Sequence, residues 1–241
     1  MVAMGVAAVV IDSFKARGVT STVQDQSAVT GQDFNLDALM ALKALNDVAR
    51  IDRAHIGIMG FSKGGTSALM ASHEQLIAAA GLPAFLRYAL HVPFYPSCSV
   101  QYYKPRTTGA PVYMLLGGAD TYVGAEPCQA YAETMRAAGG RVDVKVYPDA
   151  PHGFDGGRPY FVATGENYSQ CVLQQQANRS WVERKSGVVT IGTDGAPIPG
   201  ALALALSACR TLGVSGGPSD AAARQSMDDL KGFVRRHLLG G

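Results

Sequence analysis

Apolar residues alternate along the chain between two patterns. Short runs rich in Val, Ile and Leu are typical of strands buried on both faces of a parallel sheet. Between these runs, apolar residues three or four positions apart predict helices. The predicted strands are residues 5–12, 55–60, 89–94, 111–116 and 142–147, and the predicted helices are residues 32–49, a segment after 62, parts of 74–88, and 126–138. This alternation predicts an α/β fold with a doubly wound, mostly parallel sheet.

Residues 156–218 interrupt this alternation. They are polar, and they include the only tryptophan and a hairpin-like stretch at 188–195. An excursion of this length is usually a functional loop or a small subdomain, so we expect a lid-like insert within a single domain of residues 1–241. After residue 218 the pattern of a helix resumes, and Ser219 or Asp220 can cap this last helix. Its predicted apolar face consists of Met227, Leu230, Val234 and Leu238.

Composition excludes several classes of partner. The net charge of +2 implies no polyanionic ligand, and no Lys and Arg cluster interleaves with aromatic residues, so we expect no nucleic acid partner. No apolar run is long enough to span a bilayer, so we expect no membrane partner. The apolar N-terminus lacks a basic start and a cleavage site, and is therefore predicted to be a strand rather than a signal peptide.

Four cysteines stand at positions 98, 128, 171 and 209, with no spacing typical of a metal site. We therefore expect no metal and no cofactor. The four residues either remain reduced thiols or form two disulfides in one of three pairings. Pairing 98 with 128 and 171 with 209 would stabilise the chain by ~4 kcal/mol per bond. The protein is expected to be cytoplasmic by default, or extracytoplasmic if disulfides form and a leader has been lost.

The motif Gly60-x-Ser62-x-Gly64 lies where a predicted strand turns into a predicted helix. In this context a serine hydroxyl is exposed at the carboxyl end of the sheet, on a turn that requires small flanking residues. The amides that follow open a helix, where developing negative charge is stabilised. Ser62 is therefore the predicted nucleophile, and the backbone N–H of Lys63 is the predicted oxyanion donor.

A serine nucleophile needs a base, and the base needs an orienting acid. Asp120 and His152 each follow a later predicted strand, in the chain order Ser, Asp, His that doubly wound hydrolases use. Asp149 is a competing acid, but it lies three residues from His152 on the same loop and is predicted to form a turn. The remaining histidines are expected to be structural: His55, His73, His91 and His237.

Three motifs resemble those of the dienelactone hydrolase-like family of the α/β-hydrolase superfamily. They span residues 60–65, 117–123 and 147–154, and the resemblance extends from about residue 5 to 155 and resumes in the last helix. It implies the α/β-hydrolase fold, with Ser62 as nucleophile, His152 as base and then acid, and Asp120 as its partner. The best-known members use a cysteine nucleophile, so Ser62 favours general ester or lactone hydrolysis.

The resemblance also implies that the N-terminus is shortened. Residues 5–12 correspond to the fourth strand of the fold, so the three preceding strands and the loop after the third are missing. That loop normally supplies the second oxyanion donor, whose loss costs roughly 10²–10³ in turnover. We therefore expect weak activity, unless another segment or a second subunit of a homo-oligomer completes the sheet.

Five side chains are candidates for substrate binding. Phe94 and Tyr95 either line an acyl pocket or pack in the core. Arg17 either binds a substrate carboxylate or is solvated at the surface. Tyr122 borders the predicted cleft, and Trp181 covers the site if the insert is a lid.

The favoured function is a serine hydrolase acting on a small-molecule ester or lactone. A peptidase or acyltransferase on the same scaffold is an alternative, although the sequence shows neither extended peptide recognition nor a dry acceptor site. A second alternative is a binding module that retains the three residues but lacks the oxyanion loop.

Overall fold

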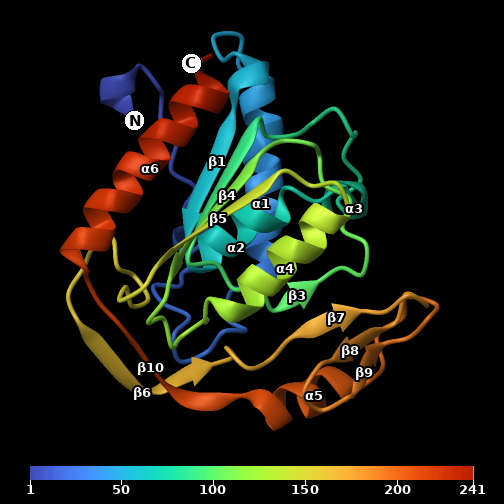
Figure 1. Ribbon diagram of the computed structural model, residues 1–241. Helices are drawn as coiled ribbons and strands as arrows, with labels where there is room; N and C mark the ends of the chain where they lie inside the picture. Colours follow the sequence, from blue (N-terminus) through green and yellow to red (C-terminus); the bar gives the residue numbers. More distant parts are fainter. Residues whose placement is uncertain (241) are drawn as a thin grey trace.

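The computed structural model describes residues 1–240. Its central sheet has four parallel strands in the order β1 (Gly57–Phe61), β2 (Leu90–Phe94), β4 (Val112–Gly117) and β5 (Val142–Tyr147) (Figure 1). Helices follow β1, β4 and β5 along the chain, with an insert before the last of them. The predicted α/β fold with a parallel sheet is confirmed.

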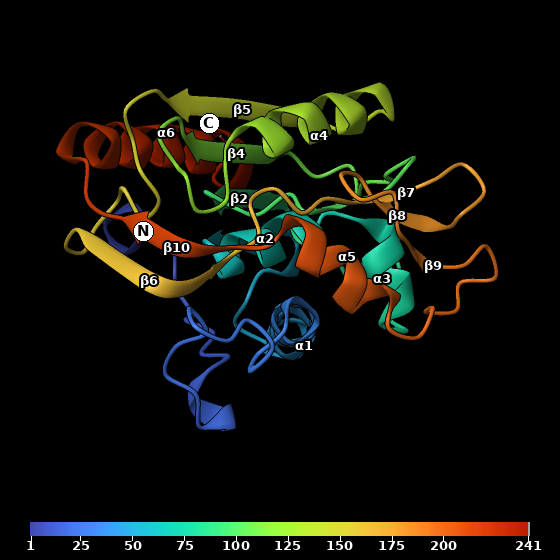
Figure 2. The same cartoon turned by 90° about the horizontal axis from the view of Figure 1, so that it is seen from below.

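Helices cover both faces of this sheet. On one face lie α1 (Gly31–Asn46), α2 (Lys63–Met70) and α4 (Glu126–Ala137), whose apolar residues pack with alternate residues of β1, β4 and β5. The other face packs against α6 (Asp220–Leu238) (Figures 1 and 2). A short helix, α3 (Glu74–Ala79), occupies part of the segment where a broken helix was predicted. The central strands β2 and β4 are therefore buried almost throughout, as their continuous apolar runs predicted, whereas β1 and β5 at the edges of the sheet keep exposed residues.

Side-chain caps set the first residue of two helices. Thr30 and Asp33 form a capping box at α1, and the Ser219 hydroxyl accepts the N–H of Ala222 at α6. On α6, the predicted apolar face is right for three residues, but Met227 is 38% exposed. The buried stripe of the helix passes through Ser226 instead, which is fully buried.

The predicted strand at residues 5–12 is wrong. The short 3-10 helix η1 (Val2–Met4) is followed by an irregular segment, in which Val9, Val10 and Ile11 are 63%, 90% and 42% exposed. A strand needs a hydrogen-bonding neighbour as well as an apolar sequence, and within residues 1–240 nothing pairs with the outer edge of β1. That another segment or a second copy completes this edge stays a prediction.

The insert forms two small β structures. Strands β6 (Tyr160–Asn167) and β10 (Thr211–Gly216) make an antiparallel ribbon. Strands β7 (Leu173–Gln175), β8 (Trp181–Glu183) and β9 (Val189–Ile191) extend from β3 (Val100–Gln101) of the body. Helix α5 (Ala201–Cys209) connects the two structures. Figures 1 and 2 show the insert beyond the carboxyl ends of the central strands.

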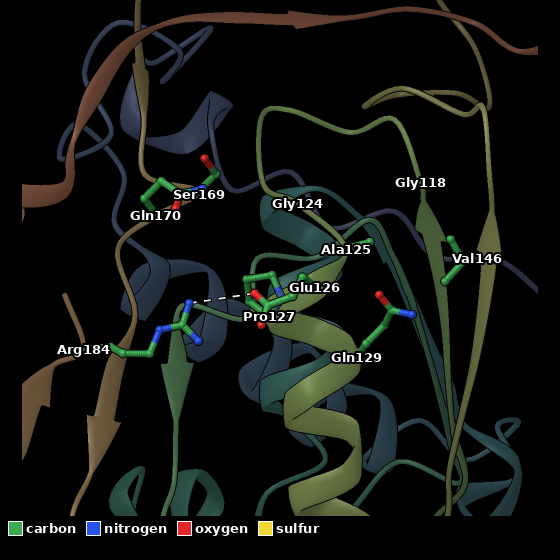
Figure 3. Close-up of a pocket in the computed structure, with 10 residues that line it drawn as sticks. All are labelled: Gly118, Gly124, Ala125, Glu126, Pro127, Gln129, Val146, Ser169, Gln170 and Arg184. Carbon is green, nitrogen blue, oxygen red and sulfur yellow. Dashed lines mark ion pairs between the residues drawn. The ribbon is translucent and has the colours of Figure 1, made fainter.

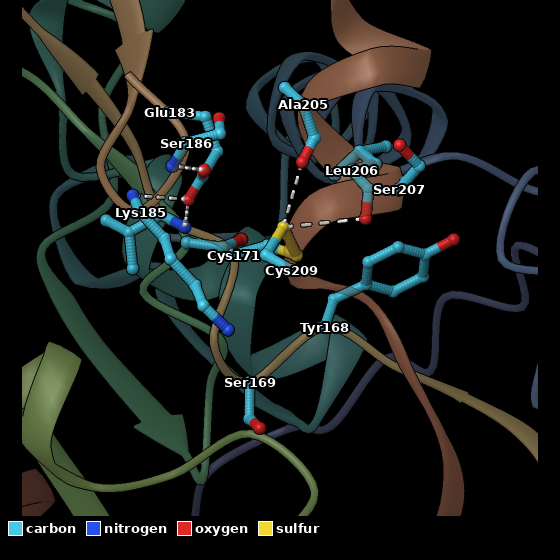
Figure 4. The surroundings of a disulfide bond; sticks show 12 residues. Tyr168, Ser169, Cys171, Glu183, Lys185, Ser186, Ala205, Leu206, Ser207 and Cys209 are labelled. Carbon is cyan, nitrogen blue, oxygen red and sulfur yellow. Dashed lines mark hydrogen bonds between the residues drawn. A yellow bond between two sulfur atoms is a disulfide. The ribbon is translucent and has the colours of Figure 1, made fainter. Parts of the chain in front are cut away.

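Two disulfides cross-link the chain. Cys98, in the segment after β2, is bonded to Cys128 of α4, and Cys171 is bonded to Cys209 at the end of α5. Figure 4 shows the second bond beside Glu183, a fully buried carboxylate that accepts backbone N–H groups. The structure therefore has the pairing considered first among the three. Within residues 1–240, no helix is both long enough and apolar enough to cross a bilayer.

Candidate active site

Ser62 lies where β1 turns directly into α2. Its backbone has φ 53° and ψ −118°, a conformation that residues with side chains rarely adopt. The turn is tight enough to exclude side chains nearby: a Cβ added at Gly60 would lie 2.3 Å from the carbonyl oxygen of Gly64. A Cβ at Gly65 would lie 2.5 Å from the carbonyl oxygen of Phe94. The predicted tight turn is therefore present, but the glycines that it requires are Gly60 and Gly65, because a Cβ at Gly64 would meet nothing within 4 Å.

The ring of His152 contacts both other members of the predicted triad. Its Nε2 lies 2.8 Å from Ser62 Oγ, and its Nδ1 lies 2.8 Å from Asp120 Oδ2. An ionised carboxylate can only accept, so Nδ1–H donates to Asp120 and Nε2 is left to accept the serine proton. His152 and Asp120 are 4% and 7% exposed. The three residues thus form a continuous chain of hydrogen bonds from Ser62 through His152 to Asp120.

Asp120 is held by its own loop. Its second oxygen, Oδ1, accepts the backbone N–H groups of Tyr122 and Val123 at 2.8 Å and 3.0 Å. Both carboxylate oxygens therefore have partners, and the group is fixed in one orientation toward His152.

Two tyrosine rings pack against His152. The ring centroids of Tyr95 and Tyr122 each lie 4.8 Å from that of the imidazole. Tyr95 has a φ of 33°, and its hydroxyl donates a hydrogen bond to Asp155. Phe94 is fully buried and packs against other aromatic rings, so its side chain belongs to the core.

Lys63 has two separate roles in the geometry. Its backbone N–H belongs to the first turn of α2, where amides have no intrahelical acceptor and can bind an oxyanion. Its ammonium donates to the carbonyl oxygens of Val29 and Gln26 at 2.7 Å and 3.3 Å. Burial lowers the pKa of Lys63 to about 8, against the opposing effect of nearby carboxylates.

Two of the predicted substrate-binding residues have other partners. The guanidinium of Arg17 forms two hydrogen bonds with the carboxylate of Asp37 on α1, at 2.7 Å and 2.9 Å. Trp181 packs edge-on against Tyr102, with ring centroids 5.3 Å apart. Of these predicted residues, Tyr95 and Tyr122 therefore contact His152, whereas Arg17 and Trp181 contact Asp37 and Tyr102.

Three residues near the triad were not predicted from the sequence. Phe61, directly before Ser62, is 42% exposed and packs against Phe94, with ring centroids 4.9 Å apart. Its position within the glycine motif is a signal that could have identified it. Asp155 follows His152 by three residues, so its position in the sequence could have identified it equally well. Gln26 donates to the hydroxyl of Tyr122, 96 positions away, and no local pattern indicates such a contact.

A cavity of about 370 Å³ lies beside the loop that carries Asp120 (Figure 3). It is lined by Gly118 and Gly124 of that loop, by the first turn of α4 and by Arg184, which lies 3.8 Å from Glu126. Neither Ser62 nor His152 lines it. Within residues 1–240, no group of three or more His, Cys, Asp and Glu side chains is placed to hold a metal ion.

Sequence comparison gives a clear family match. The model of the dienelactone hydrolase family matches residues 5–185, about three quarters of the 241-residue chain. That range contains Ser62, Asp120 and His152. No curated protein sequence matches the chain.

Solved structures give more distant matches. The apo form of Thermogutta terrifontis esterase 2 is 20% identical, with a TM-score of 0.41, and 52% of this chain covers 57% of that one. Dipeptidyl peptidase 4 of Porphyromonas gingivalis is 19% identical, with a TM-score of 0.42 over 53% and 20% of the two chains. MGS-M1, an α/β hydrolase enzyme from a Medee basin deep-sea metagenome library, is 22% identical, with a TM-score of 0.41 over 50% of each chain. The chain thus spans little more than half of the length of these proteins, or less.

Proposed function

Because the chain belongs to the dienelactone hydrolase family, we propose that it is a serine hydrolase that cleaves carboxylic esters or lactones through an acyl-enzyme. The observation that carries the proposal is the pair of 2.8 Å contacts that join His152 to Ser62 on one side and to Asp120 on the other. A serine beside a base that an acid orients is the arrangement that covalent acyl transfer requires.

The proposed reaction begins with a proton transfer from Ser62 Oγ to Nε2 of His152. The oxygen attacks the substrate carbonyl, and the Lys63 N–H stabilises the negative charge that develops on the carbonyl oxygen. His152 then returns the proton to the leaving alcohol oxygen as the ester bond breaks. Water repeats the sequence on the acyl-enzyme: His152 takes its proton, the hydroxyl attacks, and Ser62 is released with its proton restored.

Two features of the site support esters or lactones over a charged substrate. The side chains that contact the base are the aromatic rings of Tyr95 and Tyr122, and the exposed side chain next to the nucleophile is Phe61. The one arginine that the sequence proposed as a carboxylate ligand is already paired with Asp37. The surroundings of Ser62 therefore favour an uncharged acyl group.

The test compares hydrolysis of p-nitrophenyl esters of increasing acyl length by the natural protein and by Ser62→Ala. We expect the variant to lose at least about 10³-fold in kcat/KM, because the nucleophile is removed. Ser207→Ala removes an exposed serine of α5 and should retain full activity.

Three results would contradict the proposal. Equal inactivity of folded natural protein and Ser62→Ala would favour a binding module. A higher kcat/KM on peptide anilides than on esters would favour a peptidase. Full kcat/KM in a folded His152→Asn variant would remove His152 from its assigned role.

A further inference from the structure

We propose that Tyr122 and Tyr95 form a clamp, that is, two aromatic rings that fix the ring of His152 between them. We propose further that Gln26, from a distant segment, holds Tyr122 in place. This inference rests on the proposed function, because the orientation of His152 matters only if it transfers protons. The base must present Nε2 to Ser62 and Nδ1 to Asp120 at the same time. Any rotation of the ring breaks both contacts, so the geometry needs restraint from the sides.

The two tyrosines supply that restraint from different elements. The ring of Tyr95 meets the imidazole at an interplanar angle of 66°, and the ring of Tyr122 meets it at 55°. Tilted and edge-on contacts of this kind are favourable for aromatic rings and restrict their rotation. His152 is therefore held by its ring surface as well as by its two nitrogen atoms.

Tyr95 is bound to the loop of the base itself. Its hydroxyl donates to Asp155, three residues after His152, and its backbone N–H donates to Leu115 O on β4 at 2.8 Å. The φ of 33° is uncommon for a residue with a side chain and persists only when the surroundings impose it. This conformation turns the ring from the end of β2 toward His152.

Tyr122 joins the acid to the base. Its backbone N–H donates to Asp120 Oδ1 at 2.8 Å, while its ring packs on His152. Its hydroxyl accepts a hydrogen bond from Gln26 Nε2 at 3.0 Å. One residue thus fixes the carboxylate through its backbone and the imidazole through its side chain, and Gln26 holds the far end of that side chain.

Gln26 is itself fixed by two neighbours. Its backbone N–H donates to Glu166 Oε2 on β6 at 2.9 Å, and its carbonyl oxygen accepts from Lys63 Nζ. Lys63 follows the nucleophile directly. Gln26 is therefore fixed by contacts with the residue after Ser62 and with the insert ribbon. Because it holds the hydroxyl of Tyr122, it also restrains the positions of Asp120 and His152.

The test is a double-mutant cycle of Gln26→Leu and Tyr122→Phe, both of which remove only the distal hydrogen bond. We expect each to lower kcat by about three- to tenfold with KM within twofold, because a slightly misplaced base slows proton transfer. The double variant should lose no more than the larger single loss, since both changes break one interaction. Tyr122→Leu removes the ring as well and should lose about 10- to 100-fold in kcat.

Tyr103→Leu is the matched control, because Tyr103 is 50% exposed and should leave kcat unchanged. Unfolding curves for every variant show whether the loss is one of folding. An effect confined to KM would overturn the clamp and make Tyr122 a substrate contact. Losses that multiply in the double variant would show that Gln26 and Tyr122 act independently, and would overturn the role of Gln26.

A second readout does not depend on hydrolysis. With ¹⁵N-labelled histidine, the Nδ1–H of His152 should give a slowly exchanging proton signal that broadens in Tyr122→Leu and persists in Tyr103→Leu. If the natural protein hydrolyses no ester and this signal still responds, the clamp stands and the proposed function fails. If the signal is identical in Tyr122→Leu, the clamp fails whatever the activity.

Discussion

The α/β body and the insert of residues 156–218 are held together by different means. Within residues 1–240, the buried residues of the three apolar clusters all belong to the body, from Ala38 on α1 to Leu238 on α6. The insert buries few large apolar side chains. Apart from glycines, its buried residues are Val172, Val214, Cys171, Cys209, Ala201, Ala205, Asn167, Ser180, Glu183 and Thr190. The body is thus stabilised by apolar burial, and the insert by a cross-link and polar contacts.

The insert nevertheless touches the loops that carry the acid and the base. Asn167 Nδ2 donates to the carbonyl oxygen of Thr121, next to Asp120, at 3.0 Å. The N–H of Gly217 donates to the carbonyl oxygen of His152 at 2.9 Å. The proposed catalytic groups belong to the well-packed body, but part of their support comes from the region with the smaller apolar core.

The largest effect expected in the body comes from Gly60→Ala. The added Cβ would lie 2.3 Å from the Gly64 carbonyl oxygen, which is backbone and cannot move aside. Overpacking of this kind should destabilise the protein by more than about 3 kcal/mol. Gly64→Ala is the matched control, because a Cβ there meets nothing within 4 Å. Equal unfolding midpoints in urea for the two variants would contradict this account of the turn.

Removing each disulfide should destabilise a different region of the molecule. Replacing Cys171 and Cys209 with alanine should cost about 2–4 kcal/mol, and the loss should fall on the insert, which has little else to hold it. Replacing Cys98 and Cys128 should cost a similar amount but lower the stability of the body. Hydrogen exchange measured on peptides shows whether the insert or the body loses protection in each double variant. Uniform loss of protection in both double variants would show that insert and body unfold as one unit.

Mild acid should act on the body through two buried histidines, His73 and His91. Burial lowers the pKa of each from an ordinary 6.5 to about 4. The unfolded chain therefore binds protons that the folded protein does not, so this stabilisation is full above pH 6.5 and is lost as the pH falls to 4. The loss should be at most about 3 kcal/mol per histidine.

Urea unfolding at pH 7 and pH 4.5 measures this loss. His91→Asn can retain the hydrogen bond to Ala68 O without the titrating ring, and its free energy of unfolding should depend less on pH. If the free energy of unfolding of His91→Asn falls with pH as steeply as that of the natural protein, groups other than His91 cause the acid sensitivity.

The smallest effect is expected at Arg17, which lies outside both the site and the insert. Its guanidinium is committed to Asp37, so Arg17→Gln should change KM for neutral esters and for esters carrying a carboxylate by less than about twofold. A selective rise in KM for the charged esters would restore the carboxylate-binding role that the sequence suggested.

The sequence predicted those parts of the molecule whose signals are local. Strand and helix periodicity located the body, and the order of Ser62, Asp120 and His152 after successive strands identified residues that the structure brings into contact. Residues 5–12 have the composition of a buried strand, but pairing depends on a neighbour that the periodicity of one segment does not describe. Gln26 and Tyr122 meet only because the fold joins segments 96 positions apart.

The bond between Cys171 and Cys209 also closes residues 171–209 into a covalent ring. The stretch from 193 to 200 inside that ring is exposed throughout and is the natural place for a protease to cut. A single cut there opens the ring without releasing a fragment, so the cleaved chain keeps its full mass until the disulfide is reduced. Protease damage to the insert would therefore go undetected on a non-reducing gel and appear as two bands on a reducing one.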